Sequence, residues 1–569
     1  MEQETILSPS VVVREITFND NRKMEFNKDD IILLVGANNV GKSRTLKDLK
    51  DDLNERITSK ILVKDLIYEE TGFTTGNLKD YFERNISKSS YGSYNVPVDE
   101  DNIYSFYDNN FTDLGERKNF YKALFSFLST ENRLNLTRPI KFNHSVDTQN
   151  LNILQKLERD SNSINRLNQA LDSGFQKSIE ISEDYLDGSL IKKYKIGDSH
   201  AIEDAIKSAS REKISKLKQF EDLHNQGDGI RNAVAILSSL IVSEHSLFLI
   251  DEPETFLHPP QARILGKNIV KLSVGKQLFI STHNIDFIRG ALETGDSRIK
   301  IIKIDRYDNK NIFNLVDNYS INKIANDKNL KYTNILNGLF YNQVILCENE
   351  SDCKFYSAIL EYEDLTTYQN TLFCAVGGKE QFKKIVKLLK DLSIKYKIIA
   401  DIDLINNIDS LKQLLNSSNP NCYSEIAPKH KKFIEKFQKG TNNQVKTQED
   451  IRNEINQIYN ADKFMSPQSV EQIKSILREI NSLKLLKTGG KSIIPQGECI
   501  NLFNHINEFL KENNIFILEC GEIERFVPDV LGHGNKWVEN TFMKYDKIEA
   551  EVYHEARNFM KMILNHNSK

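Results

Sequence analysis

The sequence predicts an α/β protein with two mostly parallel sheets, one in each half of the chain. In the first half, the apolar run 31–35 leads into a glycine-rich turn and then into 44–49, which has helical spacing. The apolar runs 247–250 and 277–281 have the composition of buried strands. From residue 344 onward, apolar runs alternate with helical segments a second time. Alternation of this kind indicates parallel strands that are covered by helices on both faces.

The composition argues against several classes of protein. The 569 residues carry a formal net charge of −4, so any binding of nucleic acid must come from local basic patches. No apolar run reaches the roughly 18–20 residues of a membrane span, and the acidic N-terminus has no signal-peptide core. The six cysteines include no C-x-x-C pair, which argues against a zinc site and against a disulfide framework. We therefore expect a cytoplasmic protein without a membrane partner.

The turn at 36–43 is predicted to bind the phosphates of ATP. It fits the pattern G-x-x-x-x-G-K-[ST], and it lies between a buried strand and a helix, as a phosphate-binding loop requires. Lys42 would reach the β- and γ-phosphates, and the hydroxyl of Ser43 would ligate Mg²⁺. The residues expected to contact the nucleotide are Gly36, Asn38, Asn39, Gly41, Lys42, Ser43 and Arg44.

Polar residues at the ends of two later strands extend this predicted site. Asp251 and Glu252 follow the apolar run 247–250. Asp251 would hold Mg²⁺ through water, and Glu252 would orient and deprotonate the attacking water. His283 follows the run 277–281, and its place at a strand end beside the predicted site favours a functional role over a structural one.

The same segments resemble the ABC and SMC-like ATPases. Two expected antiparallel strands, 11–18 and 24–26, precede the phosphate-binding loop, as in ABC-type enzymes. The string Asp251-Glu252-Pro253-Glu254, followed by Leu257-His258-Pro259, is similar to the segment that meets the partner subunit in these families. A histidine at the position of His283 senses the γ-phosphate there, so the resemblance implies that role for His283.

A further resemblance implies a dimer. Gly227 and Gly229 open a helix and resemble a degenerate ABC signature loop, about twenty residues before the strand that ends in Asp251. In the family this loop faces the γ-phosphate of ATP bound to the opposite subunit. We therefore expect residues 1–335 to form an ABC-type P-loop ATPase domain. Within it, residues 145–222 would be an inserted helical and hairpin segment and a candidate dimerisation region.

Acidic residues at strand ends in the second half predict a metal site. Glu348 follows the apolar run 344–347, and Asp352 lies four residues later. Asp401 and Asp403 come at the end of another apolar run, and alternation along a strand would put both side chains on one side. Carboxylates without His or Cys suit Mg²⁺ or Mn²⁺. Such ions activate water and stabilise the leaving oxygen of a phosphodiester.

These acidic strings resemble a TOPRIM domain, in which E-G-x-x-D is followed by D-x-D. The sequence departs from the pattern at Asn349, where glycine is usual, but asparagine tolerates a positive φ better than most residues. The later string Gly521-Glu522-Ile523-Glu524 is similar to the G-[DE]-[LI]-E segment of nucleases of the OLD (overcoming lysogenisation defect) family. The resemblance implies that Glu524 completes the metal site and that Lys536 neutralises charge in the transition state.

An ABC-type ATPase followed by a TOPRIM domain resembles the OLD-family ATP-dependent nucleases. These include the nuclease subunit of the Gabija system and, more distantly, the ATPase/TOPRIM proteins of the PARIS system. The resemblance implies that residues 336–569 form a TOPRIM nuclease domain with a helical insertion at 404–513. It also implies homodimers or higher homo-oligomers, and a role in anti-phage defence with a companion protein or a phage trigger.

Three functions remain open on these residues. The leading one is an ATP-regulated, divalent-metal-dependent endonuclease that acts on nucleic acid, with DNA expected ahead of RNA. The second is a phage-triggered toxin of the PARIS kind, whose TOPRIM domain cleaves tRNA. The third is an SMC-like, ATP-driven DNA clamp or sensor with an inactive TOPRIM module. The patterns in 51–145 and 404–513 indicate no function.

Overall fold

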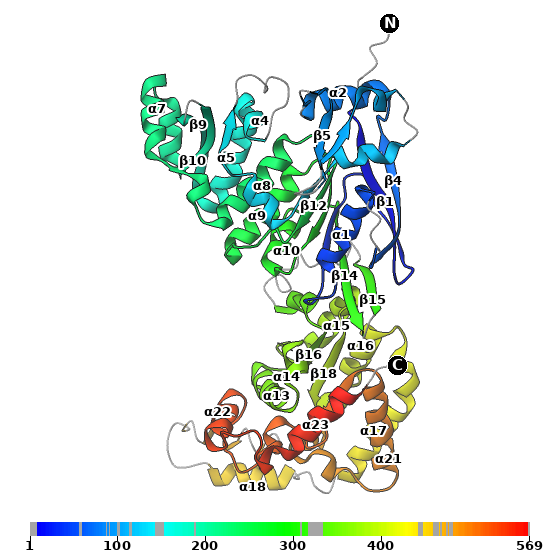
Figure 1. The fold of residues 1–569 in the computed structure, drawn as a ribbon. Helices are drawn as coiled ribbons and strands as arrows, with labels where there is room; N and C mark the ends of the chain where they lie inside the picture. The colour runs from blue at the N-terminus through cyan, green and yellow to red at the C-terminus, as the bar shows by residue number, and fades with distance from the viewer. Residues whose placement is uncertain are drawn as a thin grey trace. The chain divides into compact units, whose positions relative to one another are not determined.

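The computed structural model divides the chain into two compact units, Met1–Thr333 and Asn334–Lys569 (Figure 1). Within 8–566, the structure describes all residues except 56–59, 87, 90, 99–102, 113–115, 143–152, 187–188, 308–309, 317–333, 442–447 and most of 459–481, where only 466, 469, 470, 472, 473 and 476 are described. Residues 145–152 of the expected first insertion and parts of the expected second insertion therefore lie outside the described residues. No helix in the described part of the chain combines the length and the apolar character that crossing a bilayer requires.

A six-stranded sheet forms the centre of the first unit, in the order β15-β14-β3-β13-β12-β7. All neighbouring strands are parallel except β15, which runs antiparallel to β14. All five residues of β3 are buried, as predicted from their continuous apolar character. The strands are β3 (Ile31–Val35), β7 (Phe125–Leu128), β12 (Leu247–Asp251), β13 (Gln277–Ser281), β14 (Ile299–Tyr307) and β15 (Lys310–Val316).

Smaller sheets complete the first unit. The strand β1 (Ser10–Phe18) pairs antiparallel with β2 (Lys23–Glu25), as predicted, and also with β4 (Val63–Thr71). The hairpin of β9 (Lys177–Leu186) and β10 (Ser189–Asp198) also pairs with β8 (Ile140–Phe142) and β11 (Glu221–Asp222), and β5 (Tyr94–Pro97) pairs with β6 (Ile103–Phe106). The described α-helices are α1 (Lys42–Leu53), α2 (Thr75–Asn85), α3 (Thr130–Asn135), α4 (Ile153–Arg159), α5 (Ser161–Phe175), α6 (Ser199–Lys207), α7 (Ser210–Gln219), α8 (Asp228–Val242), α9 (Pro259–Leu272) and α10 (Ile285–Leu292).

The second unit is built on a four-stranded parallel sheet in the order β17-β16-β18-β19. Its strands are β16 (Gln343–Cys347), β17 (Thr371–Ala375), β18 (Tyr396–Asp401) and β19 (Ile515–Leu518). Since the strands are parallel, their carboxyl ends meet at one edge of the sheet, where Glu348 and Asp401 lie. The two sheets confirm the predicted α/β fold.

Helices cover this sheet and fill the long connection between β18 and β19. The aromatic side chains of Phe355, Trp537 and Tyr553 belong to one buried core. The helix α13 packs against α22 and α23, and Figure 1 shows these three helices in the second unit. The described α-helices are α13 (Glu350–Glu363), α14 (Leu365–Gln369), α15 (Phe382–Asp391), α16 (Ile408–Ser418), α17 (Cys422–Thr441), α18 (Gln448–Ile458), α20 (Ser482–Gly489), α21 (Glu498–Glu512), α22 (Asn535–Lys544) and α23 (His554–Asn565).

Candidate functional site

The predicted phosphate-binding loop joins β3 to α1 and depends on two glycines with positive φ. Gly36 has φ +148°, and a Cβ there would lie 2.3 Å from the carbonyl oxygen of Ile304 in β14. Gly41 has φ +104°, and a Cβ there would lie 2.4 Å from the side chain of Leu62. Side chains at either position would therefore force the loop away from its neighbours.

The remaining predicted nucleotide contacts lie in this loop and in the first turn of α1. Asn38 and Asn39 belong to the turn, and Asn39 has φ +62°. Ser43 and Arg44 follow Lys42 in the first turn of α1. The Nε of Arg44 donates a hydrogen bond of 2.8 Å to Asp48, a buried carboxylate one turn further along the helix.

The ammonium group of Lys42 is folded back into its own loop. It donates hydrogen bonds of 2.9 Å to the carbonyl oxygens of Gly36 and Ala37, and only 7% of the residue is exposed. Burial lowers the pKa of Lys42, while the negative charges of Glu252, Glu254 and Asp251 oppose that shift. The lysine is thus held in the loop and within electrostatic range of the acidic strand end.

The backbone turns sharply after Asp251 and is held by the neighbouring strand. The hydroxyl of Ser281, at the end of β13, donates to the carboxylate of Asp251. The backbone N–H of Glu252 donates to the carbonyl oxygen of Ser281 at 3.0 Å. Glu252 has φ +48°, a left-handed conformation that costs free energy in a residue other than glycine. Strain at a predicted active-site residue is consistent with a fixed functional position for Glu252.

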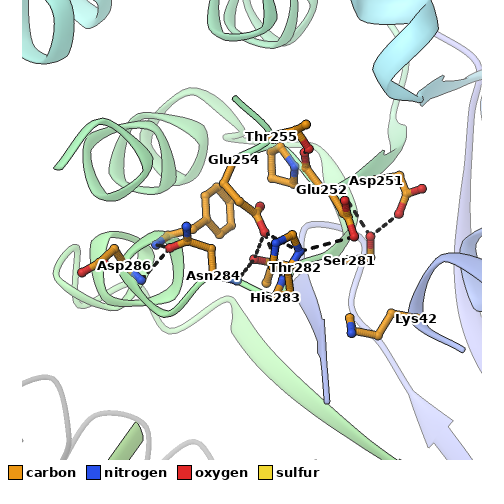
Figure 2. A network of polar contacts seen from close by, with 12 residues as sticks. Lys42, Asp251, Glu252, Glu254, Thr255, Ser281, Thr282, His283, Asn284 and Asp286 are labelled. Atoms are coloured by element: carbon orange, nitrogen blue, oxygen red, sulfur yellow. Dashed lines mark hydrogen bonds and ion pairs between the residues drawn. The ribbon is translucent and has the colours of Figure 1, made fainter. Parts of the chain in front are cut away.

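Figure 2 shows His283 between two glutamates. Its Nδ1 lies 3.3 Å from Oε1 of Glu252 and 3.5 Å from Oε1 of Glu254. The backbone N–H of His283 and the hydroxyl of Thr282 also donate to Glu254, at 3.0 and 2.8 Å. Burial raises the pKa of Glu254, and the hydrogen bonds from Thr282 and His283 work against that rise. Glu254 thus fixes the backbone of His283 beside Glu252, a function that the sequence did not indicate.

Arg133 is a second residue that sequence analysis missed. This arginine of α3 is fully buried. Its Nη1 donates to the carbonyl oxygens of Leu128 and Asp251 at 2.9 and 2.6 Å, and its Nη2 donates to that of Glu252 at 3.1 Å. Burial lowers its pKa to about 10, although Asp251, Glu254 and Glu252 act in the opposite direction. Arg133 therefore fixes two consecutive peptide groups, those that begin at the carbonyls of Asp251 and Glu252.

The two glycines of the predicted signature loop lie at the start of α8. Gly227 precedes the helix, and a Cβ there would meet no atom within 4 Å. A Cβ at Gly229 would lie 2.5 Å from the carbonyl oxygen of Phe256. Phe256 belongs to the loop after β12 and is 58% exposed. The predicted signature loop therefore packs against the segment that follows the acidic strand end.

In the second unit, three of the predicted metal ligands come together. One ligand oxygen from each of Glu348, Asp401 and Asp403 lies within 4.8 Å of the others. The expectation that Asp401 and Asp403 alternate along one strand is wrong, because β18 ends at Asp401 and Asp403 lies in a 3₁₀ helix, Ile402–Asn406. The tight turn of this helix, and not strand alternation, returns Asp403 to the group.

Asp352 and Asn349 lie beside this group at the start of α13. Asn349 has φ −133°, so the position does not require the positive φ that glycine would supply. Its backbone N–H donates to the carboxylate of Asp352 at 3.1 Å. Burial, followed by the charge of Asp401, raises the pKa of Asp352 to about 6. The departure from the TOPRIM pattern at Asn349 is therefore compatible with the local backbone.

Two lysines pair with these carboxylates. Lys379 forms an ion pair with Asp403 and lies 3.8 Å from Glu348. Lys487 of α20 lies 2.8 Å from Asp401 and 3.9 Å from Glu522. Neither lysine was predicted as a site residue from the sequence.

Glu524 belongs to a neighbouring group with Glu522 and His533, whose ligand atoms also lie within 4.8 Å of one another. One oxygen of Glu524 accepts a 2.8 Å hydrogen bond from the backbone N–H of Gly534 and lies 2.6 Å from Nδ1 of His533. The charge of Asp401 acts on Glu522, so the two groups are close electrostatically. Lys536 is exposed in the first turn of α22, and its predicted role stays a prediction.

The donor atoms of the first group fit a divalent cation. All three side chains are carboxylates, the ligands that Mg²⁺ and Mn²⁺ prefer. Burial, followed by the charges of Asp401 and Asp403, raises the pKa of Glu348 to about 8, although Lys379 lowers it. A cluster that must hold a proton to limit its negative charge is one in which a divalent cation would be stabilised.

This pKa predicts that the metal-free protein loses stability as the pH rises. Since the pKa of Glu348 is about 8 in the folded state and 4.5 without perturbation, the folded state retains a proton that the unfolded state releases. The contribution of Glu348 to the free energy of unfolding is complete below pH 4.5 and is lost as the pH rises through 8. Thermal unfolding in EDTA across this range measures the effect. Glu348→Gln should flatten the dependence, and equal slopes for the variant and the wild type would contradict the assignment.

Two protein-family models match the chain. The TOPRIM-domain model described as overcoming lysogenization defect protein-like matches residues 339–403. A model of an AAA domain, described for the AbiEii toxin of a type IV TA system, matches residues 31–289. An ATPase domain and a TOPRIM domain imply the use of a nucleotide and of a divalent metal ion.

Two similar curated proteins are nucleases by name. The Old nuclease of Escherichia phage P2 is 24% identical over 306 residues, which cover 52% of this chain and 45% of the relative. Endonuclease GajA of Bacillus cereus (strain VD045) is 26% identical over 242 residues, which cover 41% of this chain and 40% of the relative. The chain therefore matches less than half the length of either relative.

A solved structure of an SmcHead bound to the C-winged helix domain of ScpA covers 54% of this chain and 97% of its own, at 12% identity and a TM-score of 0.31. That TM-score is too low to support a functional statement.

The two domain models occur in the predicted order, and both curated relatives are nucleases. The chain therefore carries an ATPase domain followed by an OLD-like TOPRIM domain, and it is similar to the Old nuclease and to endonuclease GajA.

Proposed function

We propose that this protein is an ATP-regulated, divalent-metal-dependent endonuclease that cleaves nucleic acid, with DNA ahead of RNA. The proposal rests on the convergence of Glu348, Asp401 and Asp403 within 4.8 Å at the carboxyl ends of β16 and β18. The printed names of two relatives, a nuclease and an endonuclease, agree with it.

In the proposed site, Glu348, Asp401 and Asp403 would hold a Mg²⁺ or Mn²⁺ ion, and Glu524 with its neighbours would hold a second. Bound metal would supply an activated water and would stabilise the leaving oxygen of the phosphodiester. Asp352, which is also proposed as a metal ligand, caps the start of α13 and thereby fixes the turn after Glu348. Lys536 is proposed to neutralise charge on the phosphate from the exposed first turn of α22.

In the proposed ATPase site, the loop 36–43 would bind the phosphates of ATP, and Ser43 and Asp251 would hold a Mg²⁺ ion. Glu252 orients and deprotonates the attacking water, and His283, fixed by Glu254, senses the γ-phosphate. Gly227 and Gly229 complete the site of a second copy, so that ATP joins two protomers. In this proposal ATP regulates cleavage and does not drive movement along the nucleic acid.

We place this activity in the cytoplasm, in anti-phage defence, with a homodimer or a higher homo-oligomer as the working form. A companion defence protein or a phage trigger would control it. The support for this setting is the resemblance to the OLD-family nucleases. A Cβ at Gly227 would meet no atom within 4 Å, so this position is open to contact from a second copy in the proposed oligomer.

The test incubates the purified full chain with supercoiled plasmid, single-stranded DNA and tRNA, with Mg²⁺ or Mn²⁺, and with or without ATP. The wild type should cut or nick DNA only with metal, and Glu348→Gln should reduce cleavage by at least about 100-fold. Glu350→Gln is the matched control, because Glu350 is exposed two residues away. Cleavage of tRNA alone would favour the toxin function. No cleavage of any substrate would favour the DNA clamp and overturn the nuclease.

A further inference from the structure

The helical insertion between β18 and β19 places one lysine side chain among the acidic residues at the edge of the second sheet. Lys487, in α20, lies 2.8 Å from Oδ2 of Asp401 and 3.9 Å from Oε2 of Glu522. Asp401 belongs to the group with Glu348, and Glu522 belongs to the group with Glu524. The ammonium group of Lys487 therefore links the two groups of candidate metal ligands.

Backbone packing fixes the position of this lysine. Gly521 follows β19 with φ +114°, and a Cβ there would lie 2.2 Å from the carbonyl oxygen of Lys487. Gly490 has φ +58°, and a Cβ there would lie 2.5 Å from the carbonyl oxygen of Cys520. The backbone N–H of Lys491 donates to the carbonyl oxygen of Glu519 at 2.8 Å. Gly490 and Gly521 thus let the backbone of the insertion pack closely against the end of β19. A lysine that moved freely on the surface would not require such close packing.

Lys487 also differs electrostatically from a solvated surface lysine. About a third of its side chain is exposed. Burial alone lowers the pKa of Lys487, but the charge of Asp401 and the hydrogen bond to it raise the pKa above its ordinary value. The side chain therefore remains a cation, and its positive charge offsets the repulsion between neighbouring carboxylates.

We propose that Lys487 is a built-in competitor of the divalent cation: it holds the two carboxylate groups together without metal and sets the metal affinity of the site. This proposal rests on the proposed metal-dependent function. A divalent ion that binds at Asp401 is repelled by the positive charge of Lys487. It must also share Asp401 with Lys487 or replace Lys487 as the partner of this carboxylate. The insertion that supplies Lys487 thereby limits metal binding to conditions in which the ion is plentiful. Lys487 is a positioning residue, because it acts on the ligands of the metal.

The experiment measures Mn²⁺ binding to the full chain by isothermal titration calorimetry, together with thermal unfolding in EDTA. Lys487→Met should lower the Kd for Mn²⁺ by about tenfold, as expected when a unit charge about 6 Å from a divalent ion is removed in hydrated surroundings. The same variant should unfold at a lower temperature in EDTA. Lys487→Arg, which keeps the charge, should restore both properties. A merely structural defect would weaken metal binding, so a tighter Kd separates the two explanations.

The matched control is Lys491→Met, because Lys491 comes from the same insertion and pairs with Glu519 at 2.7 Å, outside both groups. It should leave the Kd unchanged. Lys487→Gln replaces Lys487→Met as the test variant if the latter does not fold. An unchanged or higher Kd for the Lys487 variant, with binding lost in Asp401→Asn, would overturn the competitor role and leave the metal site standing. Equal Mn²⁺ binding by wild type and Asp401→Asn would overturn the metal site itself, and this proposal with it.

Discussion

Lys42→Ala is expected to weaken ATP binding by roughly tenfold to 100-fold, the range for losing one hydrogen bond to a charged group, and to reduce ATP hydrolysis to background. The ammonium group of Lys42 is held in the loop by the carbonyl oxygens of Gly36 and Ala37, close to where the pattern predicts the phosphates. Alanine removes the positive charge and leaves both carbonyl groups without this donor. Binding of a fluorescent ATP analogue and release of phosphate measure the two effects.

Lys47→Ala is the matched control for this experiment. Lys47 lies on the same helix as Lys42 but is exposed, so its removal changes the net charge equally without touching the loop. Nucleotide binding should remain at the wild-type level in this control. Unchanged ATP hydrolysis in Lys42→Ala would show that the phosphate-binding loop is wrongly assigned. Cleavage assays on the same variant would also show whether bound ATP activates or restrains the nuclease.

Arg133→Met should reduce the kcat of ATP hydrolysis by about 100-fold while changing KM little. Arg133 donates hydrogen bonds to the carbonyl oxygens of Asp251 and Glu252. None of its described hydrogen bonds reaches a residue of the phosphate-binding loop. Without its guanidinium group, the left-handed backbone at Glu252 loses a donor that holds it. Buried carbonyl groups left without partners should also lower the free energy of unfolding by about 3 kcal/mol.

Steady-state kinetics and thermal unfolding of Arg133→Met test this prediction together. Arg138→Met serves as the control, because Arg138 is exposed five residues further along the chain. Arg133→Lys should restore activity only in part, since an ammonium group cannot reproduce the planar fork that meets several carbonyl groups. A folded Arg133→Met protein with normal kcat would show that Arg133 stabilises the domain without positioning Glu252.

The sequence alone determined the α/β fold and the order of its two domains. The strand at Ile31–Val35 could be predicted because a strand buried on both faces needs a continuous apolar run. The adjoining turn could be predicted because a phosphate cradle demands glycines at fixed spacing. The acids at 251–252 and the aspartate at 401 could be placed at the ends of strands, because each follows a continuous apolar run. The catalytic and ligand roles of these residues stay predictions.

The tertiary structure decided which residues from distant segments surround these strand ends. Arg133 meets Asp251 across 118 positions of sequence. Lys487 reaches Asp401 from an insertion rich in polar residues, where one lysine has no local pattern that separates it from solvated neighbours. Asp403 joined its group through a 3₁₀ turn instead of the expected strand. Local patterns report which face of an element is buried, whereas the partners of a buried charge are set by contacts between segments that no single stretch of sequence encodes.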